Sequence, residues 1–175
     1  LRREIAFSRE VLRSLPGVFY MIDQDGHFAG WNRRFEKVTG REAGSLGAVL
    51  PLDLFPPEEQ ALIQQAIEQV FQEGSVTVEA HLLGPSGESC PYYFTGYRVE
   101  LEDDNYLLGV GLDISQRKAM EGSLHRYRAA FEQSRDALLF ADRDHYLEGN
   151  PATLALFGVD SDEAFRDRHP ADFSP

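Results

Sequence analysis

The side chains that could hold a metal ion lie in turns. His27 and His145 occupy matching positions in two short turns, and imidazole nitrogens are common ligands of transition metals. Acidic side chains also gather in turns, at Asp23, Asp25, Asp103 and Asp104. Aspartate is frequent in turns because its carboxylate accepts hydrogen bonds from the nearby backbone, and turn histidines are usually solvated. We therefore expect no metal site.

The sequence offers no set of groups that would form an enzyme active site. No nucleophile, base and acid occur at a spacing typical of catalysis, and there is no glycine-rich loop of the kind that binds phosphate. The single cysteine, Cys90, cannot form an internal disulfide, and its place beside Pro91 favours a structural over a redox-sensing thiol. The chain is predicted not to be an enzyme and to reside in a reducing compartment such as the cytoplasm.

The bulk composition is that of a folded, acidic protein. Of its 175 residues 42% are hydrophobic, and the net charge is −12. Phosphate backbones and anionic lipid surfaces attract concentrated lysine and arginine, so we expect no nucleic-acid partner and no direct membrane contact. No apolar run is long enough to span a bilayer, and no signal peptide is evident. The initial Leu1 suggests a fragment of a parent protein that could itself be membrane-tethered.

The elements that must position these side chains begin with an amphipathic helix, Leu1–Leu15, which Pro16 and Gly17 end. The runs Val18–Ile22 and His27–Trp31 flank a tight turn and predict a hairpin.

Three helical segments should follow the hairpin. Asn32 is expected to cap Arg33–Thr39, which Gly40 closes, and the segment 41–55 predicts one or two brief helices. Pro56 opens a long helix, because apolar residues then recur every three or four positions until Gly74.

From Ser75 onward the apolar period changes to two. Strands are expected at Ser75–Leu83, at Ser89–Leu101 and, after an acidic turn at residues 102–105, at Tyr106–Ile114. With the opening hairpin these strands predict an α+β fold: a five-stranded antiparallel sheet with its helices on one face.

Residues 18–40 recur, with one glycine missing from the turn, as residues 137–158. The sequence therefore predicts four parts: an N-terminal amphipathic helix (1–15), a first domain (16–115), a connecting helix (116–134) and the truncated start of a second domain (135–175). Ser115 is a candidate cap for the connecting helix. Along this helix an apolar stripe is formed by Met120, Leu124, Tyr127 and Phe131.

This pattern resembles the Per-Arnt-Sim (PAS) sensory family. The resemblance rests on the turn after Ile22, on the Trp31-Asn32 entry into a helix that ends at Gly40, and on the run Leu108–Ser115 followed by Arg117. It implies tandem sensory domains of a bacterial-type signalling protein, the second one incomplete, flanked by amphipathic signalling helices. Asp113 and Arg117 would mark the handover from the last strand to the signalling helix.

Residue types also bear on the cofactor that the resemblance could imply. Leu50 stands where the flavin photoreceptors of the family carry their reactive cysteine, and Gly111 stands where they carry a glutamine. The long helix after Pro56 contains no histidine that could ligate a haem iron. Covalent flavin photochemistry and haem are therefore not expected, whereas a non-covalently bound flavin remains an alternative.

By analogy with the flavin branch, alternate strand residues line the space beneath the helices. The candidate pocket consists of Phe35, Phe55, Ile67, Leu82, Tyr92, Phe94, Leu107, Gly109 and Gly111. Its glycines leave room either for a small ligand or for the bulk of Phe35, Phe55 and Ile67, and we favour the filled core. The opposite face of the sheet is apolar as well and should be covered by Leu1–Leu15 or by a second molecule.

The sequence and the resemblance favour two functions over others. In one, the chain is a sensory and dimerising module that detects a small-molecule, redox or protein cue. It then relays the cue through the 116–134 helix to a cyclic-dinucleotide enzyme or a histidine kinase, with homodimer contacts through Leu1–Leu15 and that helix. In the other, the chain is a ligand-free protein–protein interaction module. A flavin redox sensor is a third alternative.

Overall fold

A computed structural model of the chain describes residues 16–142, 145–161 and 163–164. It divides into two compact units, Leu1–Lys118 and Ala119–Pro175, which we treat one at a time. The predicted N-terminal helix, Leu1–Leu15, lies outside the described residues. Within the described ranges, none of the helices is both long and apolar enough to cross a bilayer.

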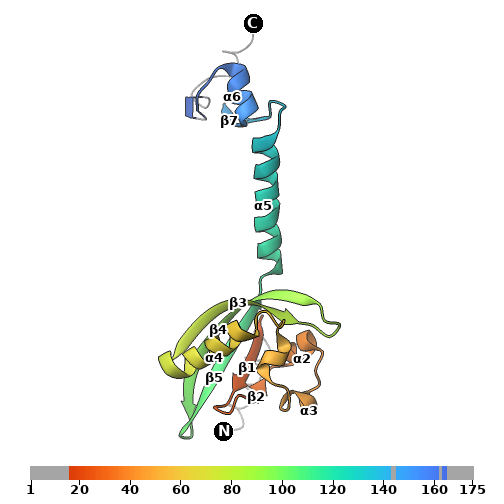
Figure 1. The fold of residues 1–175 in the computed structure, drawn as a ribbon, viewed down its shortest axis with the longest axis vertical. Coiled ribbons are helices and arrows are strands. Elements are labelled where there is room, and N and C mark those ends of the chain that lie inside the picture. Colours follow the sequence, from red (N-terminus) through yellow and green to blue (C-terminus); the bar gives the residue numbers. More distant parts are fainter. Residues whose placement is uncertain (1–15, 143–144, 162, 165–175) are drawn as a thin grey trace. The chain divides into compact units, whose positions relative to one another are not determined.

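The first unit is built around one antiparallel sheet. Its strands are β1 (Val18–Ile22), β2 (Phe28–Trp31), β3 (Ser75–Leu83), β4 (Ser89–Leu101) and β5 (Asp104–Asp113). In space they follow the order β2-β1-β5-β4-β3, and each neighbouring pair is antiparallel. The predicted α+β fold with a five-stranded antiparallel sheet is thereby confirmed (Figure 1).

In the described part of the chain up to the end of β5, the helices lie between β2 and β3. They are α2 (Arg33–Thr39), α3 (Ala43–Leu46), the 3-10 helix η1 (Pro51–Leu54) and α4 (Gln60–Glu73). As predicted, they lie on one face of the sheet (Figure 1). Apolar residues of both layers, including Ile22, Phe35, Val70 and Leu82, fill the interior between them.

Local signals explain where these helices begin and end. The side chain of Asn32 accepts a hydrogen bond from the Phe35 amide and so caps α2, while Gly40 ends that helix with a left-handed φ of 65°. The long helix begins later than predicted, because Pro56–Glu59 forms a turn closed by a 2.9 Å bond from the Glu59 amide to the Pro56 carbonyl.

The outer face of the sheet carries large apolar side chains. Tyr93, Tyr97 and Leu112 point away from the helices and are 37%, 53% and 44% exposed. Ile114, two positions beyond Leu112, is buried instead, because the chain has left the sheet after Asp113.

The turn between β4 and β5 is tighter than predicted. Leu101 pairs with Asp104, so only Glu102 and Asp103 form the loop, and both have positive φ angles of 52° and 73°. β5 accordingly starts at Asp104 rather than Tyr106. A side chain with a Cβ is disfavoured in this region, and two-residue hairpin loops of this kind favour Asn-Gly.

Replacing Glu102 with Asn and Asp103 with Gly should raise the unfolding free energy of the first unit by about 1 kcal/mol, because the backbone strain is relieved. Urea denaturation would measure the change. The control is Glu100→Asn with Asp104→Asn in the adjoining strands, which also removes two negative charges but relieves no strain. An equal gain from that control would contradict the explanation.

The second unit repeats the opening of the first. The helix α5 (Ser115–Gln133) leads to β6 (Leu139–Ala141), β7 (Tyr146–Gly149) and α6 (Pro151–Phe157). The turns match, since the Asp23 amide donates to the His27 carbonyl and the Asp142 amide to the His145 carbonyl, both at 2.9 Å.

The caps of the repeated helices match as well. Asn150 caps α6 as Asn32 caps α2, and Gly158 ends α6 with a φ of 63°. The internal repeat predicted from the sequence is therefore present in the fold.

Candidate functional site

The predicted pocket residues lie together in the first unit, between helices and sheet. Eight of them are buried and Ile67 is half-buried; the set is Phe35, Phe55, Ile67, Leu82, Tyr92, Phe94, Leu107, Gly109 and Gly111. Strand alternation thus identified the inner face of the sheet correctly. Whether a ligand fits there depends on what lies over the glycines.

The space above the glycines is occupied by side chains of the chain itself. A methyl group added at Gly109 would overlap the phenol ring of Tyr20. At Gly111 it would lie 2.6 Å from Phe94 and 2.7 Å from Val18. These glycines therefore allow aromatic and β-branched neighbours to approach the sheet backbone. The bulk that fills the room comes from Tyr20, Phe94 and Val18 rather than from the predicted Phe35, Phe55 and Ile67.

Two small cavities remain on either side of Tyr20. One of about 40 Å³ lies among Tyr20, Phe35 and Phe55, and one of about 30 Å³ lies among Tyr20, Val78 and Phe94. Each has room for about one water molecule, whereas drug-sized ligands occupy pockets of about 300–1,000 Å³. A flavin would therefore require the core to repack.

Tyr20 is the central residue that the sequence analysis missed. Its ring centroid lies 5.6 Å from that of Phe35 and 6.3 Å from that of Phe94, and burial raises the pKa of its phenol above the usual 10.0. The alternation of β1 does contain a signal, because the buried Val18 and Ile22 flank Tyr20 on the same face.

The exit from the first unit is fixed by the residues after β5. The Asp113 carboxylate accepts a 2.8 Å hydrogen bond from the Ser115 amide, so Asp113 rather than the predicted Ser115 provides the cap at the start of α5. Next to it the Ile114 amide donates to the Pro91 carbonyl at 3.0 Å. The first turn of α5 is thereby joined to the start of β4.

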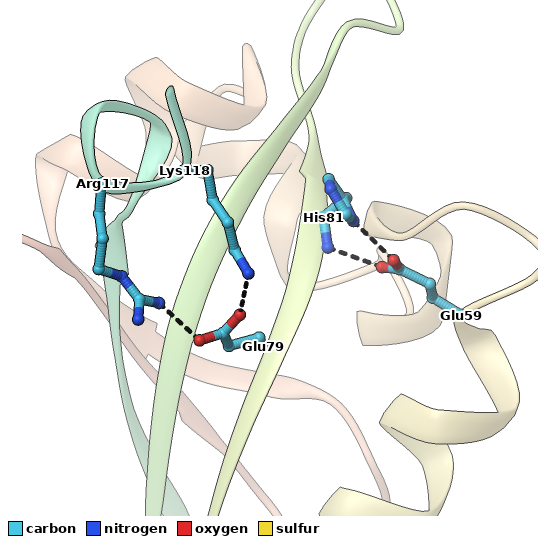
Figure 2. A network of polar contacts seen from close by, with 5 residues as sticks. All are labelled: Glu59, Glu79, His81, Arg117 and Lys118. Carbon is cyan, nitrogen blue, oxygen red and sulfur yellow. Dashed lines mark hydrogen bonds and ion pairs between the residues drawn. The ribbon is translucent and has the colours of Figure 1, made fainter. Parts of the chain in front are cut away.

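A second link joins α5 to the sheet through Glu79 on the edge strand β3. One Glu79 oxygen lies 2.5 Å from Arg117 Nη2 and the other lies 2.6 Å from Lys118 Nζ, as Figure 2 shows. The hydrogen bonds from Lys118 and Arg117 lower the pKa of the Glu79 carboxyl. Sequence reasoning selected Arg117 but not its partner, because the two residues are 38 positions apart.

Replacing Glu79 with Gln should loosen the first turn of α5 without unfolding the sheet, because the three side chains are largely exposed and such pairs contribute modestly. Amide hydrogen exchange at Lys118 and Ala119 should accelerate about two- to fivefold. Lowering the pH should likewise reduce the protection factors of these two amides in the wild type, once the slower intrinsic exchange at low pH is taken into account. Because the pKa of the Glu79 carboxyl is lower in the folded protein than its value of 4.5 in the unfolded chain, the ionised carboxylate stabilises α5 above pH 4.5. This stabilisation is lost as the pH falls through the pKa of the folded protein.

The control for this experiment is Glu88→Gln, a carboxylate in the β3–β4 turn. Unchanged exchange at Lys118 in Glu79→Gln, at neutral pH, would contradict a role of Glu79 in holding α5.

Two residues further along the edge strand β3, Glu59 binds His81. Its two carboxylate oxygens lie 2.6 Å from the His81 amide and 2.6 Å from His81 Nδ1 (Figure 2). Glu59 directly precedes α4, so this contact fixes the start of that helix to the edge of the sheet. His81 therefore has a structural partner.

The histidine and aspartate side chains considered as metal ligands do not converge. His27 Nδ1 lies 3.8 Å from Asp23 Oδ1 within one turn, and His145 Nδ1 lies 3.6 Å from Asp142 Oδ1 in the matching turn. Among the residues that the structure describes, no three His, Cys, Asp or Glu side chains form a group that could hold a metal ion.

The apolar stripe of α5 separates into two parts. Met120, Leu124 and Tyr127 are 73%, 58% and 45% exposed, whereas Phe131 is only 6% exposed. Phe131 packs within the second unit, where its ring stacks against Phe140 with the centroids 5.6 Å apart. The ring of Tyr127 also packs in the second unit, with its centroid 6.0 Å from that of Phe131 and 5.9 Å from that of Phe140. Met120 and Leu124 are therefore the stripe residues most available to a partner helix.

The last turn of α5 is bound by Asn150, which is fully buried. Its amide nitrogen donates to the carbonyls of Phe131 at 3.0 Å and Asp136 at 2.9 Å. Its oxygen accepts hydrogen bonds from the amides of Leu138 and Thr153 at 3.0 and 2.9 Å. One side chain thus joins α5, the start of β6 and the start of α6.

Asn32 has the same position in the first unit. Its amide nitrogen donates to the Gly17 carbonyl at 3.0 Å, and its oxygen accepts from the amides of Phe19 and Phe35. In both units, therefore, the capping asparagine also binds the backbone of the segment that enters the unit. Sequence reasoning found the caps but not this second role.

Comparisons with known proteins agree with this geometry. A family model described as PAS fold matches residues 12–119, and a second, described as PAS domain, matches residues 125–174. The chain is 30% identical over 127 residues to the aerobic respiration control sensor protein ArcB of Escherichia coli (strain K12). That alignment covers 71% of this chain and 16% of the sensor protein, so the chain spans about a sixth of that relative's length.

Solved structures show the same fold. A PAS domain from a two-component sensor histidine kinase superposes with a TM-score of 0.56 at 13% identity, over 64% of this chain and 97% of that one. The N-terminal domain of a diguanylate cyclase with PAS/PAC sensor from Marinobacter aquaeolei superposes with a TM-score of 0.51 at 18% identity, over 58% and 98% of the two chains. The sheet order, the repeated capped hairpin units and both family matches together establish that this chain belongs to the PAS family and contains two PAS domains in tandem.

Proposed function

We propose that this chain is the sensory and dimerising part of a longer signalling protein, and that α5 relays a change in the first PAS domain to the second. The output would be a histidine kinase or a cyclic-dinucleotide enzyme, and the fragment itself would regulate rather than catalyse. Similarity to a sensor protein and to PAS domains of both output classes supports this proposal.

The observation that carries the proposal is the attachment of α5 at both ends. Its first turn is held by Asp113 and by the Glu79 pair with Arg117 and Lys118, and its last turn is held by Asn150. Between these attachments the helix exposes apolar side chains at intervals of four and three residues, a spacing that suits a helical partner. A shift of α5 against a twin helix would thus act on both domains.

The exposed part of the stripe provides the test. Met120→Asp combined with Leu124→Asp should shift the sedimentation of the chain from dimer to monomer, because the charges would disrupt an apolar helix pair. His125→Asp with Gln133→Asp is the control, since it adds two negative charges to exposed positions on the face of α5 opposite the stripe. Phe131 is unsuitable because it packs within its own unit. An unchanged dimer in the stripe variant would overturn the proposed pairing.

The outer sheet face suggests a second dimer contact. A methyl group on Gly17 would lie 2.9 Å from the outward side chain of Leu112, so the chain enters the sheet beside this face. We propose that the preceding segment, Leu1–Leu15, covers the exposed Tyr93 and Tyr97 and contributes to the dimer. Ile5→Asp with Leu12→Asp should then weaken dimerisation at least tenfold in sedimentation, and an unchanged dimer would exclude the segment from the interface.

A ligand-free interaction module is the second candidate, and the filled interior around Tyr20 favours it over a core-bound ligand. Absorption and native mass spectra of freshly purified protein would separate the alternatives. Flavin would give visible bands, a colourless ligand would add mass, and the absence of both would support a protein cue.

A further inference from the structure

Outside the filled core, the described residues of the first unit form several surface grooves, and one of them lies against the long helix α4. It has a volume of about 600 Å³ and lies between α4, the β1–β2 turn and the inner side of β4 and β5. This volume is in the range of small-molecule sites. Its floor includes Pro51 and Ile67, which also line the 40 Å³ cavity, so these side chains separate the groove from the core.

The groove contains charges of both signs. Arg98 lies on one side, and the carboxylates of Asp25 and Glu68 also line it. The Arg98 guanidinium donates through Nη1 to the Phe71 carbonyl, in the last turn of α4. None of the ion pairs among the described residues joins Arg98 to either carboxylate. Further guanidinium N–H groups and the carboxylate oxygens can therefore bind charges from outside.

The rest of the lining is partly apolar and partly amide. Phe71 joins Pro51 and Ile67 on the apolar side, while Gln72 and Asn105 offer both donors and acceptors. A simple anion would be repelled by the two carboxylates, and a simple cation by the arginine. A molecule that carries both charges beside an apolar group satisfies all three parts of the lining.

We propose that this groove binds a small zwitterion, an α-amino acid with an apolar side chain. The carboxylate of the ligand pairs with Arg98, in the bidentate geometry that guanidinium favours. The ammonium group binds the carboxylates of Asp25 and Glu68, and the apolar side chain covers Pro51, Ile67 and Phe71. This inference rests on the proposed sensory function, because it names the ligand that the first PAS domain would detect.

L-leucine is the probe, with 4-methylpentanoate and 3-methylbutylamine as compounds of similar shape that lack the ammonium or the carboxylate. In NMR titrations of the full chain, leucine should give saturable shifts at the amides of residues 24–26 and 64–72. The dissociation constant of each of the other two compounds should be higher by a factor of about ten or more, because a charge-assisted hydrogen bond is lost. No saturable shift with leucine, or equal binding of all three compounds, would overturn the proposal.

Two variants locate the site. Arg98→Gln keeps a donor for the Phe71 carbonyl but removes the charge, and Glu68→Gln keeps the side-chain shape. Each should weaken leucine binding about tenfold. The control is Glu73→Gln: the Gln69–Glu73 hydrogen bond matches the Gln64–Glu68 bond at 2.7 Å, but lies outside the groove.

Leucine affinity within twofold of the wild type is expected for Glu73→Gln, and the same result for Arg98→Gln would overturn the assignment. Sedimentation of the same samples reports α5 pairing separately, so a failure of the groove and a failure of the proposed relay are distinguishable.

Discussion

Replacing Tyr20 with alanine should lower the unfolding free energy of the first PAS domain by about 3–5 kcal/mol, as large aromatic truncations in cores do. The ring fills the space over Gly109 and contacts Phe28, Phe35 and Phe94. Its removal would join two cavities of about 40 and 30 Å³ into one that also includes the volume of the ring. Chemical denaturation would measure the loss. The control is Leu62→Ala, on α4 and 45% exposed, which should cost about 1 kcal/mol or less.

The enlarged cavity allows two further measurements. p-Cresol, which has the shape of the missing side chain, should bind Tyr20→Ala and raise its unfolding free energy in proportion to RT ln(1 + [L]/Kd). In addition, Gly109→Ala should be destabilising in the wild type but much less so in the Tyr20→Ala background, with a coupling of about 1–3 kcal/mol. Additive effects of the two substitutions would show that Tyr20 does not occupy the space above Gly109.

Asn150→Asp should destabilise the second unit by about 3 kcal/mol or more. Aspartate keeps the oxygen that caps α6, but it loses the donors to the Phe131 and Asp136 carbonyls. A buried carboxylate facing carbonyl oxygens is unfavourable, because the charge is desolvated without a compensating donor. Hydrogen exchange should accelerate at the amides of Leu138, Leu154 and the last turn of α5.

The matched variant is Asn32→Asp in the first unit. Its effects should appear at the amides of Phe19 and Phe35 and leave those of the second unit unchanged, because the two asparagines serve separate units. A loss of protection confined to the first turn of α6 in Asn150→Asp would mean that this residue is only a cap, and would remove its role in binding α5.

Some features of this protein follow directly from residue order. The period of two in β3, the proline and glycine limits of the helices, and the asparagine caps at residues 32 and 150 all act between residues close in the chain. The same local signals occur twice, which is why the repeat and the PAS fold could be predicted. Alternation also identified the inner side of the sheet.

The tertiary structure decided which side chains meet. Alternation places Gly109 on the inner face, but only the pairing of β1 with β5 brings Tyr20 opposite it. Glu79 and Arg117 are 38 residues apart, and no local pattern joins them. Phe131 has the same spacing as its neighbours on the α5 stripe, yet it packs against Phe140 while Leu124 stays exposed. Local sequence specifies the conformation of a segment and the face of each residue, whereas contacts between distant segments depend on strand register and on how the core fills its volume.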